Sequence, residues 1–203
     1  SGKHAGFLTL ARQLGVPTDG YGDAGHPVQR QVFHVLAEMT GADADHAVVA
    51  VDGCGVPVMA MSLTELARGF SLLADPDRLP ALRSAAVRRV CEAMTSHPLL
   101  IGGTDRFDTV VTEAGGGAVL TKGGAEGVAC AALLGLGLGI AVKIDDGGKR
   151  AAEVALAALM LQFTAANGLL RSVLTGFGTV VLRNTCGEEV GLIRPVAGWP
   201  DPH

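Results

Sequence analysis

The spacing of hydrophobic residues divides the chain into a helical first part and a strand-rich second part. In the first part apolar residues recur every three or four positions, which is the period of an amphipathic helix. The pattern predicts helices at residues 4–14, 27–40, 63–73, 75–97 and 104–113. The apolar run at residues 47–51 is too short for a helix and predicts a buried strand or extended segment.

Apolar runs separated by glycines dominate the second part of the chain. They predict strands at residues 127–134, 139–144, 180–182 and 190–193, with a shorter apolar run at residues 115–121. One long amphipathic helix is expected at residues 149–166. Helices first and strands later favour an α+β fold over a repeating β-α-β chain. We therefore expect a mainly helical lobe at residues 1–103 and, at residues 104–203, a sheet lobe with a mainly antiparallel sheet and a long packing helix.

Composition excludes several classes of protein. The 203 residues include 16 basic and 20 acidic side chains, and 48% of them are hydrophobic. The chain is too apolar to be disordered and has no basic excess for binding nucleic acid. The longest apolar run, residues 128–142, is shorter than the roughly 20 residues of a membrane span. With four scattered cysteines and no visible signal peptide, we expect a soluble, cytoplasmic protein with no nucleic-acid or membrane partner.

Three short segments place ionisable groups among glycines, which permit sharp turns and a close approach to a ligand. They are SGKHAG at residues 1–6, VDGC at residues 51–54 and LTKGGAEG at residues 120–127. Lys122 follows an apolar run, where desolvation would lower its pKa and make it usable as a base. The alternative is an exposed lysine at a strand edge. The surroundings of Lys122 resemble, in altered letters, the Lys-Thr-Gly strand of serine β-lactamases.

Together the three segments resemble the L-asparaginase II family of the rhizobial type, and the chain is similar to the C-terminal portion of such a protein. The resemblance implies a fold like that of serine β-lactamases and hydrolysis of L-asparagine to L-aspartate and ammonia through a Ser-Lys acyl-enzyme. It implies catalytic roles for Lys122 and Asp52. It also implies substrate contacts for Ser1, His4, Gly123 and Glu126. Backbone N–H groups near Gly53 or Gly123 would stabilise the oxyanion.

The resemblance also implies zinc beside the active site, with Lys3 and Cys54 as candidate ligands and Asp52 next to them. In the family the first motif begins with a cysteine one position before the serine that opens this chain. Zinc takes four ligands in structural sites, and a lysine binds it only when neutral. We therefore expect weak or no zinc binding by this chain, with His4 and His26 as alternative ligands. Lys3 and Cys54 should lie close together in space.

The serine nucleophile of the family belongs to a portion that has no counterpart among these residues. We therefore expect the N-terminal portion of the same protein as a partner, a small amide as substrate and a homodimer. The chain alone should be inactive. Two other functions stay open: an N-terminal-nucleophile hydrolase that uses the hydroxyl and free amine of Ser1, and a non-catalytic fragment that binds a small amide or a partner.

Overall fold

The computed structural model describes residues 2–165 and 168–200 and divides the chain into two compact units. The first unit ends at Gly69 and the second begins at Phe70. The boundary expected at residues 103 and 104 separates the chain by secondary-structure content, and it stays a prediction. Each unit is described by itself below.

The first unit is mainly helical, as its sequence predicts. It contains helices α1 (Gly2–Leu14) and α2 (Pro27–Thr40), a hairpin of β1 (Val49–Val51) with β2 (Pro57–Met59), and the start of α3 (Leu63–Ala74). Helix α2 has both expected ends: Pro27 occupies its first turn, and Gly41 closes it in the left-handed conformation.

Helix α3 begins with the capping box that the sequence contains. The Ser62 N–H donates to Glu65 Oε2 at 2.6 Å, and the Glu65 N–H donates to Ser62 Oγ at 3.2 Å. The two residues thereby satisfy each other's free amide groups and define the first turn of the helix.

Strand β1 lies where a strand was expected, but the prediction that it is buried is wrong. Val49 is 43% exposed and Val51 is 72% exposed. The two three-residue strands pair with each other, so the hairpin satisfies its backbone hydrogen bonds without being enclosed in a core. A short apolar run indicates a strand, whereas the burial of that strand depends on which other segments pack against it.

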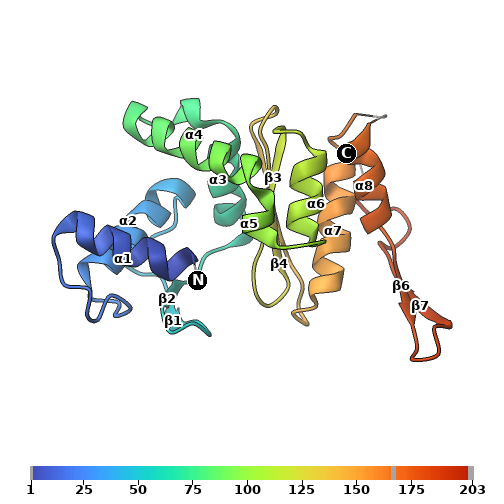
Figure 1. Cartoon of the computed structure of the whole chain (residues 1–203), viewed down its shortest axis with the longest axis horizontal. Helices are drawn as coiled ribbons and strands as arrows, with labels where there is room; N and C mark the ends of the chain where they lie inside the picture. Colours follow the sequence, from blue (N-terminus) through green and yellow to red (C-terminus); the bar gives the residue numbers. More distant parts are fainter. Residues whose placement is uncertain (1, 166–167, 201–203) are drawn as a thin grey trace. The chain divides into compact units, whose positions relative to one another are not determined.

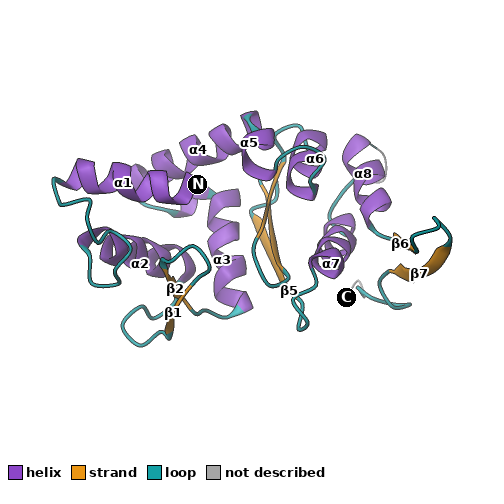
Figure 2. Cartoon of the chain, turned by 60° about the horizontal axis from the view of Figure 1, so that its bottom comes forward, coloured by secondary structure: helices purple, strands orange, loops and turns teal. Residues whose placement is uncertain are grey.

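The second unit is built on an antiparallel sheet of β3 (Val119–Gly123), β4 (Val128–Leu133) and β5 (Leu138–Lys143), in that order. Helices α6 (Phe107–Ala114), α7 (Lys149–Leu161) and α8 (Leu169–Phe177) lie on one side of it (Figures 1 and 2). On this side the strands bury Val119, Ala131 and Leu133 against Leu156 and Met160 of α7.

The opposite face of the sheet is also covered. Leu120 and Ala132 pack there against Ala74, with Phe70 and Met94 beside them. Because both faces are enclosed, β4 is continuously apolar rather than alternating, and the first three residues of β3 are all buried. The strands predicted at residues 127–134 and 139–144 are confirmed as β4 and β5.

Two predicted helices differ from the structure. The helix expected at residues 75–97 is a 3₁₀ turn, η1 (Pro76–Arg78), followed by α4 (Ala81–Ser96), because Pro80 lacks an N–H group and favours a helix start. Leu82, an apolar residue in the first turn of α4, is 90% exposed. Helix α7 ends at Leu161, short of the expected range.

The sequence interpretation had missed two helices, α5 (Pro98–Gly102) and α8. The chain ends with the predicted hairpin of β6 (Val180–Arg183) and β7 (Glu189–Ile193). Helices and antiparallel sheets in this order confirm the α+β class. The closer likeness to serine β-lactamases stays a prediction. No helix in the described part of the chain is long and apolar enough to cross a membrane.

Candidate functional site

The carboxylate of Asp52 brings the first two motifs together in the first unit. Lys3, near the start of α1, places its Nζ 2.5 Å from Asp52 Oδ2. The thiol and the backbone N–H of Cys54 both donate to Asp52 Oδ1 at 2.9 Å. The predicted proximity of Lys3 and Cys54 is confirmed, since both contact the same carboxylate. We call these three residues the Asp52 cluster.

A tight turn after β1 gives the Asp52 cluster its geometry. The Gly55 N–H donates to the Asp52 carbonyl at 2.9 Å, and the Asp52 N–H donates to the Val56 carbonyl at 3.0 Å. Gly55 has a φ of 84°, a conformation that glycine adopts without steric cost. The carboxylate of Asp52 thus folds back over the amides of its own turn, as short acidic side chains commonly do.

Hydrogen bonding fixes the charges of the cluster. Donation by the Cys54 thiol, followed by donation from Lys3, holds the pKa of Asp52 well below its ordinary value. The hydrogen bond to Asp52 in turn raises the pKa of Lys3. Near neutral pH the cluster therefore contains a carboxylate and an ammonium group. The Lys3 side chain is 45% exposed, so the desolvation that would lower its pKa does not outweigh the hydrogen bond to Asp52.

The donors of the Asp52 cluster do not by themselves fit zinc. An ammonium group has no lone pair for the metal, which leaves only Asp52 and Cys54 of the three residues. Within residues 2–165 and 168–200, no three His, Cys, Asp or Glu side chains gather in a way that could hold a metal ion. Zinc would need donors from outside the described residues.

The two histidines considered as alternative ligands have other partners. His26 Nδ1 accepts the Val28 N–H at the start of α2, and its Nε2 lies 3.0 Å from the Pro17 carbonyl. Both ring nitrogens of His26 are therefore engaged, which does not favour this residue as a replacement ligand. His4 Nδ1 lies 2.7 Å from the Tyr21 hydroxyl, and the two rings meet edge to face.

Lys122 lies in the second unit, at the point where β3 leaves the core. The preceding residues 119–121 are buried, whereas Lys122 is exposed on an edge strand and its Nζ lies 2.5 Å from the Gly123 carbonyl. The expected desolvation of this lysine is wrong, and the alternative of an exposed lysine at a strand edge is correct. Its catalytic role stays a prediction.

Asp108, in the first turn of α6, fixes the end of β3. Its Oδ2 accepts the Gly123 N–H at 2.8 Å, and its carbonyl lies 3.4 Å from Thr121 Oγ1. The Thr121 N–H donates to the buried Thr112 hydroxyl at 3.3 Å. The Gly123 N–H is therefore engaged, and an oxyanion donor elsewhere near Gly123 stays a prediction. Gly53 remains the other predicted donor.

A charged cavity of about 240 Å³ adjoins Lys122 within the second unit. It is lined mainly by Ile101, Gly102, Arg106, Phe107, Asp108, Lys122, Gly123, Gly124 and Lys149. The sequence interpretation did not identify Arg106, Asp108 or Lys149. The available signal was the pair of glycines a few residues before α6 and directly before α7, at residues 102–103 and 147–148.

The remaining predicted contacts are dispersed. Glu126 lies in the turn between β3 and β4 with a φ of 53°, and its carboxylate faces Gly147. His4 lies on α1 beside Tyr21, and Ser1 lies outside the described residues. The substrate contacts assigned to these residues and to Gly123 stay predictions.

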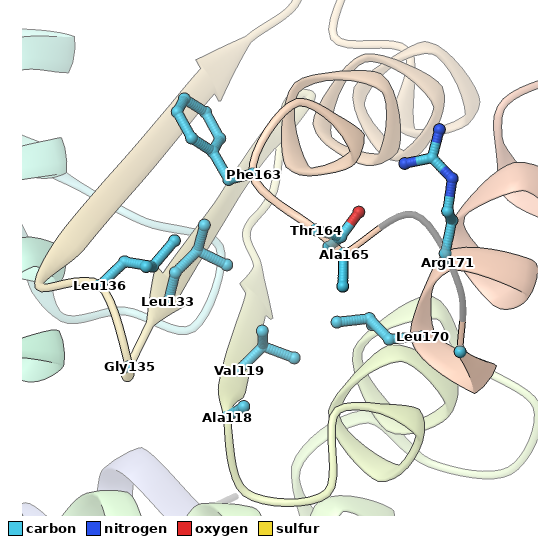
Figure 3. A pocket seen from close by; sticks show the side chains of 11 residues that line it. Ala118, Val119, Leu133, Gly135, Leu136, Phe163, Thr164, Ala165, Leu170 and Arg171 are labelled. Carbon is cyan, nitrogen blue, oxygen red and sulfur yellow. The ribbon is translucent and has the colours of Figure 1, made fainter.

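A second cavity, of about 230 Å³, is formed mainly by apolar side chains. Val119 from β3 and Leu170 from α8 point toward each other across it (Figure 3). Arg171 also lines it, but its guanidinium donates to the Leu161 carbonyl at 3.2 Å. None of the predicted site residues lines this cavity, so we do not assign it to the site.

Comparison with known families gives one match, to L-asparaginase II, over residues 1–195. The matched range includes all three motifs, the Asp52 cluster and the charged cavity. No curated protein matches the chain.

Proposed function

The chain belongs to the L-asparaginase II family, and we propose that it acts in the hydrolysis of L-asparagine to L-aspartate and ammonia. The observation that carries the proposal is the convergence of the first two motifs on Asp52. Lys3 and Cys54 are 51 residues apart, yet both contact this carboxylate within the family match. A purely structural contact would not require an acid, a base and a thiol at one exposed turn.

The proposed reaction proceeds through an acyl-enzyme. A serine from outside these 203 residues attacks the side-chain amide carbon of asparagine and passes its proton to Lys122. Lys122 then gives this proton to the departing nitrogen, which leaves as ammonia, and water hydrolyses the ester to release aspartate. This step needs Lys122 as the neutral amine.

The Asp52 cluster is assigned to substrate positioning. Asp52 is held as an anion by its donors and is suited to orient the ammonium group of an amino-acid amide. Lys3 keeps that carboxylate in place. Zinc beside the cluster and a homodimer stay predictions, and no observation favours the alternative in which Ser1 is the nucleophile.

The test is ammonia release from L-asparagine by the protein that includes the serine-bearing portion. Asp52→Asn preserves the shape of the side chain but removes its charge, and we expect kcat/KM to fall about 10²-fold, the size of loss that misplacement of a substrate causes. Asp43→Asn is the matched control, because Asp43 is an exposed aspartate of the same unit that pairs with His46. Absence of any amide hydrolysis would refute the function. Full activity of Asp52→Asn would refute only the role of this residue.

A further inference from the structure

Two helices begin at the wall of the charged cavity, and neither has a side-chain cap. Arg106 directly precedes α6, and Lys149 is the first residue of α7. In both helices the residue before the first turn makes no capping hydrogen bond through its side chain. The first N–H groups of a helix lack intrahelical partners and carry the positive end of the helix dipole. Asp108 already supplies a negative charge in the first turn of α6, whereas the first turn of α7 contains no acidic residue and favours a negative charge in the cavity.

The charged side chains around the cavity differ in what they contact. Lys122 donates to the Gly123 carbonyl, Lys149 lies 3.2 Å from Glu153 Oε1, and the Asp108 carboxylate accepts the Gly123 N–H. The guanidinium group of Arg106 makes no hydrogen bond or ion pair with any residue that the structure describes. Among the cations that line the cavity, its guanidinium group is therefore the one available to bind a ligand.

A guanidinium group is selective in what it binds. Its planar fork of N–H donors matches the two oxygens of a carboxylate, and such charge-assisted pairs are stronger than neutral hydrogen bonds. The volume of about 240 Å³ lies below the roughly 300–1,000 Å³ that is usual for drug-sized ligands. The cavity therefore suits a small carboxylate such as an amino acid.

We propose that Arg106 binds the α-carboxylate of the amide substrate in this cavity and sets the preference for amino-acid amides over uncharged amides. The inference rests on the proposed function and adds a specificity-determining residue to it. A carboxylate held by Arg106 would place the rest of an amino-acid amide beside Lys122, which lines the same cavity.

The test compares L-asparagine with L-aspartic acid diamide, in which a neutral carboxamide replaces the α-carboxylate. Both compounds carry the same side-chain amide. With the protein that includes the serine-bearing portion, we expect Arg106→Gln to raise KM for asparagine about 10- to 100-fold, as expected for loss of a charged hydrogen bond. KM for the diamide should stay within about twofold of the wild-type value. Arg89→Gln, at an exposed position of α4, is the matched control and should change neither KM.

The outcomes separate this inference from the proposed function. If the wild-type protein hydrolyses asparagine and Arg106→Gln alters both KM values equally or neither, the role of Arg106 is wrong although the function stands. If the wild-type protein hydrolyses neither compound, the proposed function is wrong. Calorimetric measurement of the Kd for the same two compounds then tests the Arg106 site by itself. A Kd for asparagine that rises in Arg106→Gln, with that of the diamide unchanged, supports the site. An unchanged Kd, or no binding by the wild type, overturns it.

Discussion

Asp52 illustrates how a single side chain can organise a site at the surface of a protein. Its two carboxylate oxygens have different partners. One lies next to the Lys3 ammonium group, and the other accepts hydrogen bonds from the thiol and the backbone N–H of Cys54. An ion pair between exposed groups contributes little to stability, because water competes for both charges. The arrangement therefore fixes positions and charges rather than stabilising the unit, as a substrate-orienting group requires.

Lys122 has a close structural counterpart in Lys143, which allows a matched test of its role. Each lysine is exposed near the end of a strand and donates from Nζ to the carbonyl of the following residue. In the protein that includes the serine-bearing portion, we expect Lys122→Ala to lower kcat about 10²- to 10⁴-fold, as loss of a general base does. Lys143→Ala should leave kcat unchanged. A loss below tenfold for Lys122→Ala with an unchanged Tm, measured by thermal unfolding, would contradict the assignment.

The four cysteines should differ in reactivity because their environments differ. Cys54 and Cys186 are exposed, whereas Cys91 and Cys130 are buried, and burial raises the pKa of Cys130 to about 12. Only the thiolate attacks a disulfide reagent. We expect a chromogenic disulfide reagent at pH 8 to titrate two thiols in the native protein and the other two after unfolding.

Single variants assign the reactive thiols. Cys54→Ser and Cys186→Ser should each remove one equivalent from the native titration, and mass spectrometry of the labelled peptides identifies the sites. Labelling of Cys130 as fast as Cys54 would show that the sheet does not enclose it. Burial of Cys91 and Cys130 suits a role as small apolar side chains, whereas the same expectation for Cys186 is wrong because this residue is exposed.

At the scale of elements, α6 determines where β3 ends and hence where Lys122 lies. The helix supplies Asp108 to the Gly123 N–H and Thr112 to the Thr121 N–H. The strand upstream is buried against both layers of helices, so its position is fixed by packing. These two hydrogen bonds also fix the position of the exposed end of the strand.

Removal of the Asp108 carboxylate should loosen this end of β3. We expect Asp108→Ala to increase the rate of amide hydrogen exchange at Gly123 and to lower the free energy of unfolding by about 1–3 kcal/mol, because a partly buried N–H loses its acceptor. The exchange rate at Leu120, in the buried part of the strand, should change little. Asp77→Ala is the control, since Asp77 is an exposed aspartate paired with Arg88. Unchanged exchange at Gly123 would contradict this positioning role.

Local signals account for the elements that the sequence predicts well. The capping box of Ser62 and Glu65, the proline and glycine that bound α2, and the apolar runs of β4 and β5 all act within a few residues. The exposure of β1 and the surroundings of Lys122 depend on packing between distant segments, and both expectations were wrong. Local pattern does not report what covers a strand.

Some residues of the candidate site could likewise be predicted from local sequence, whereas others depend on contacts between distant segments. Glycine-flanked motifs identified Lys3, Asp52 and Cys54, and the structure brings these three residues together. Asp108 and Arg106 were missed because the glycine pair at residues 102–103, the signal near them, does not by itself indicate a site. Their significance comes from the approach of α6 to the end of β3, which is a tertiary contact.

At the scale of the whole molecule, each compact unit holds one part of the proposed chemistry. The first unit carries the Asp52 cluster, and the second carries Lys122 with its charged cavity. Neither set includes a serine placed to act with its lysine, since Lys3 contacts Asp52 and Lys122 contacts the Gly123 carbonyl. The proposed mechanism therefore requires a nucleophile that these two sets do not contain.

This requirement predicts the behaviour of the 203-residue chain on its own. Loss of a nucleophilic serine costs a hydrolase about 10⁶-fold in kcat. We therefore expect the chain to release ammonia from L-asparagine no faster than its Lys122→Ala variant, and circular dichroism checks that both are folded. Joining the preceding portion of the protein to residue 1 should restore turnover, and replacement of the nucleophilic serine by alanine in that longer protein should abolish it. Hydrolysis by the 203-residue chain above the level of its Lys122→Ala variant would place the nucleophile within this chain, and the requirement for a serine from another portion of the protein would be wrong.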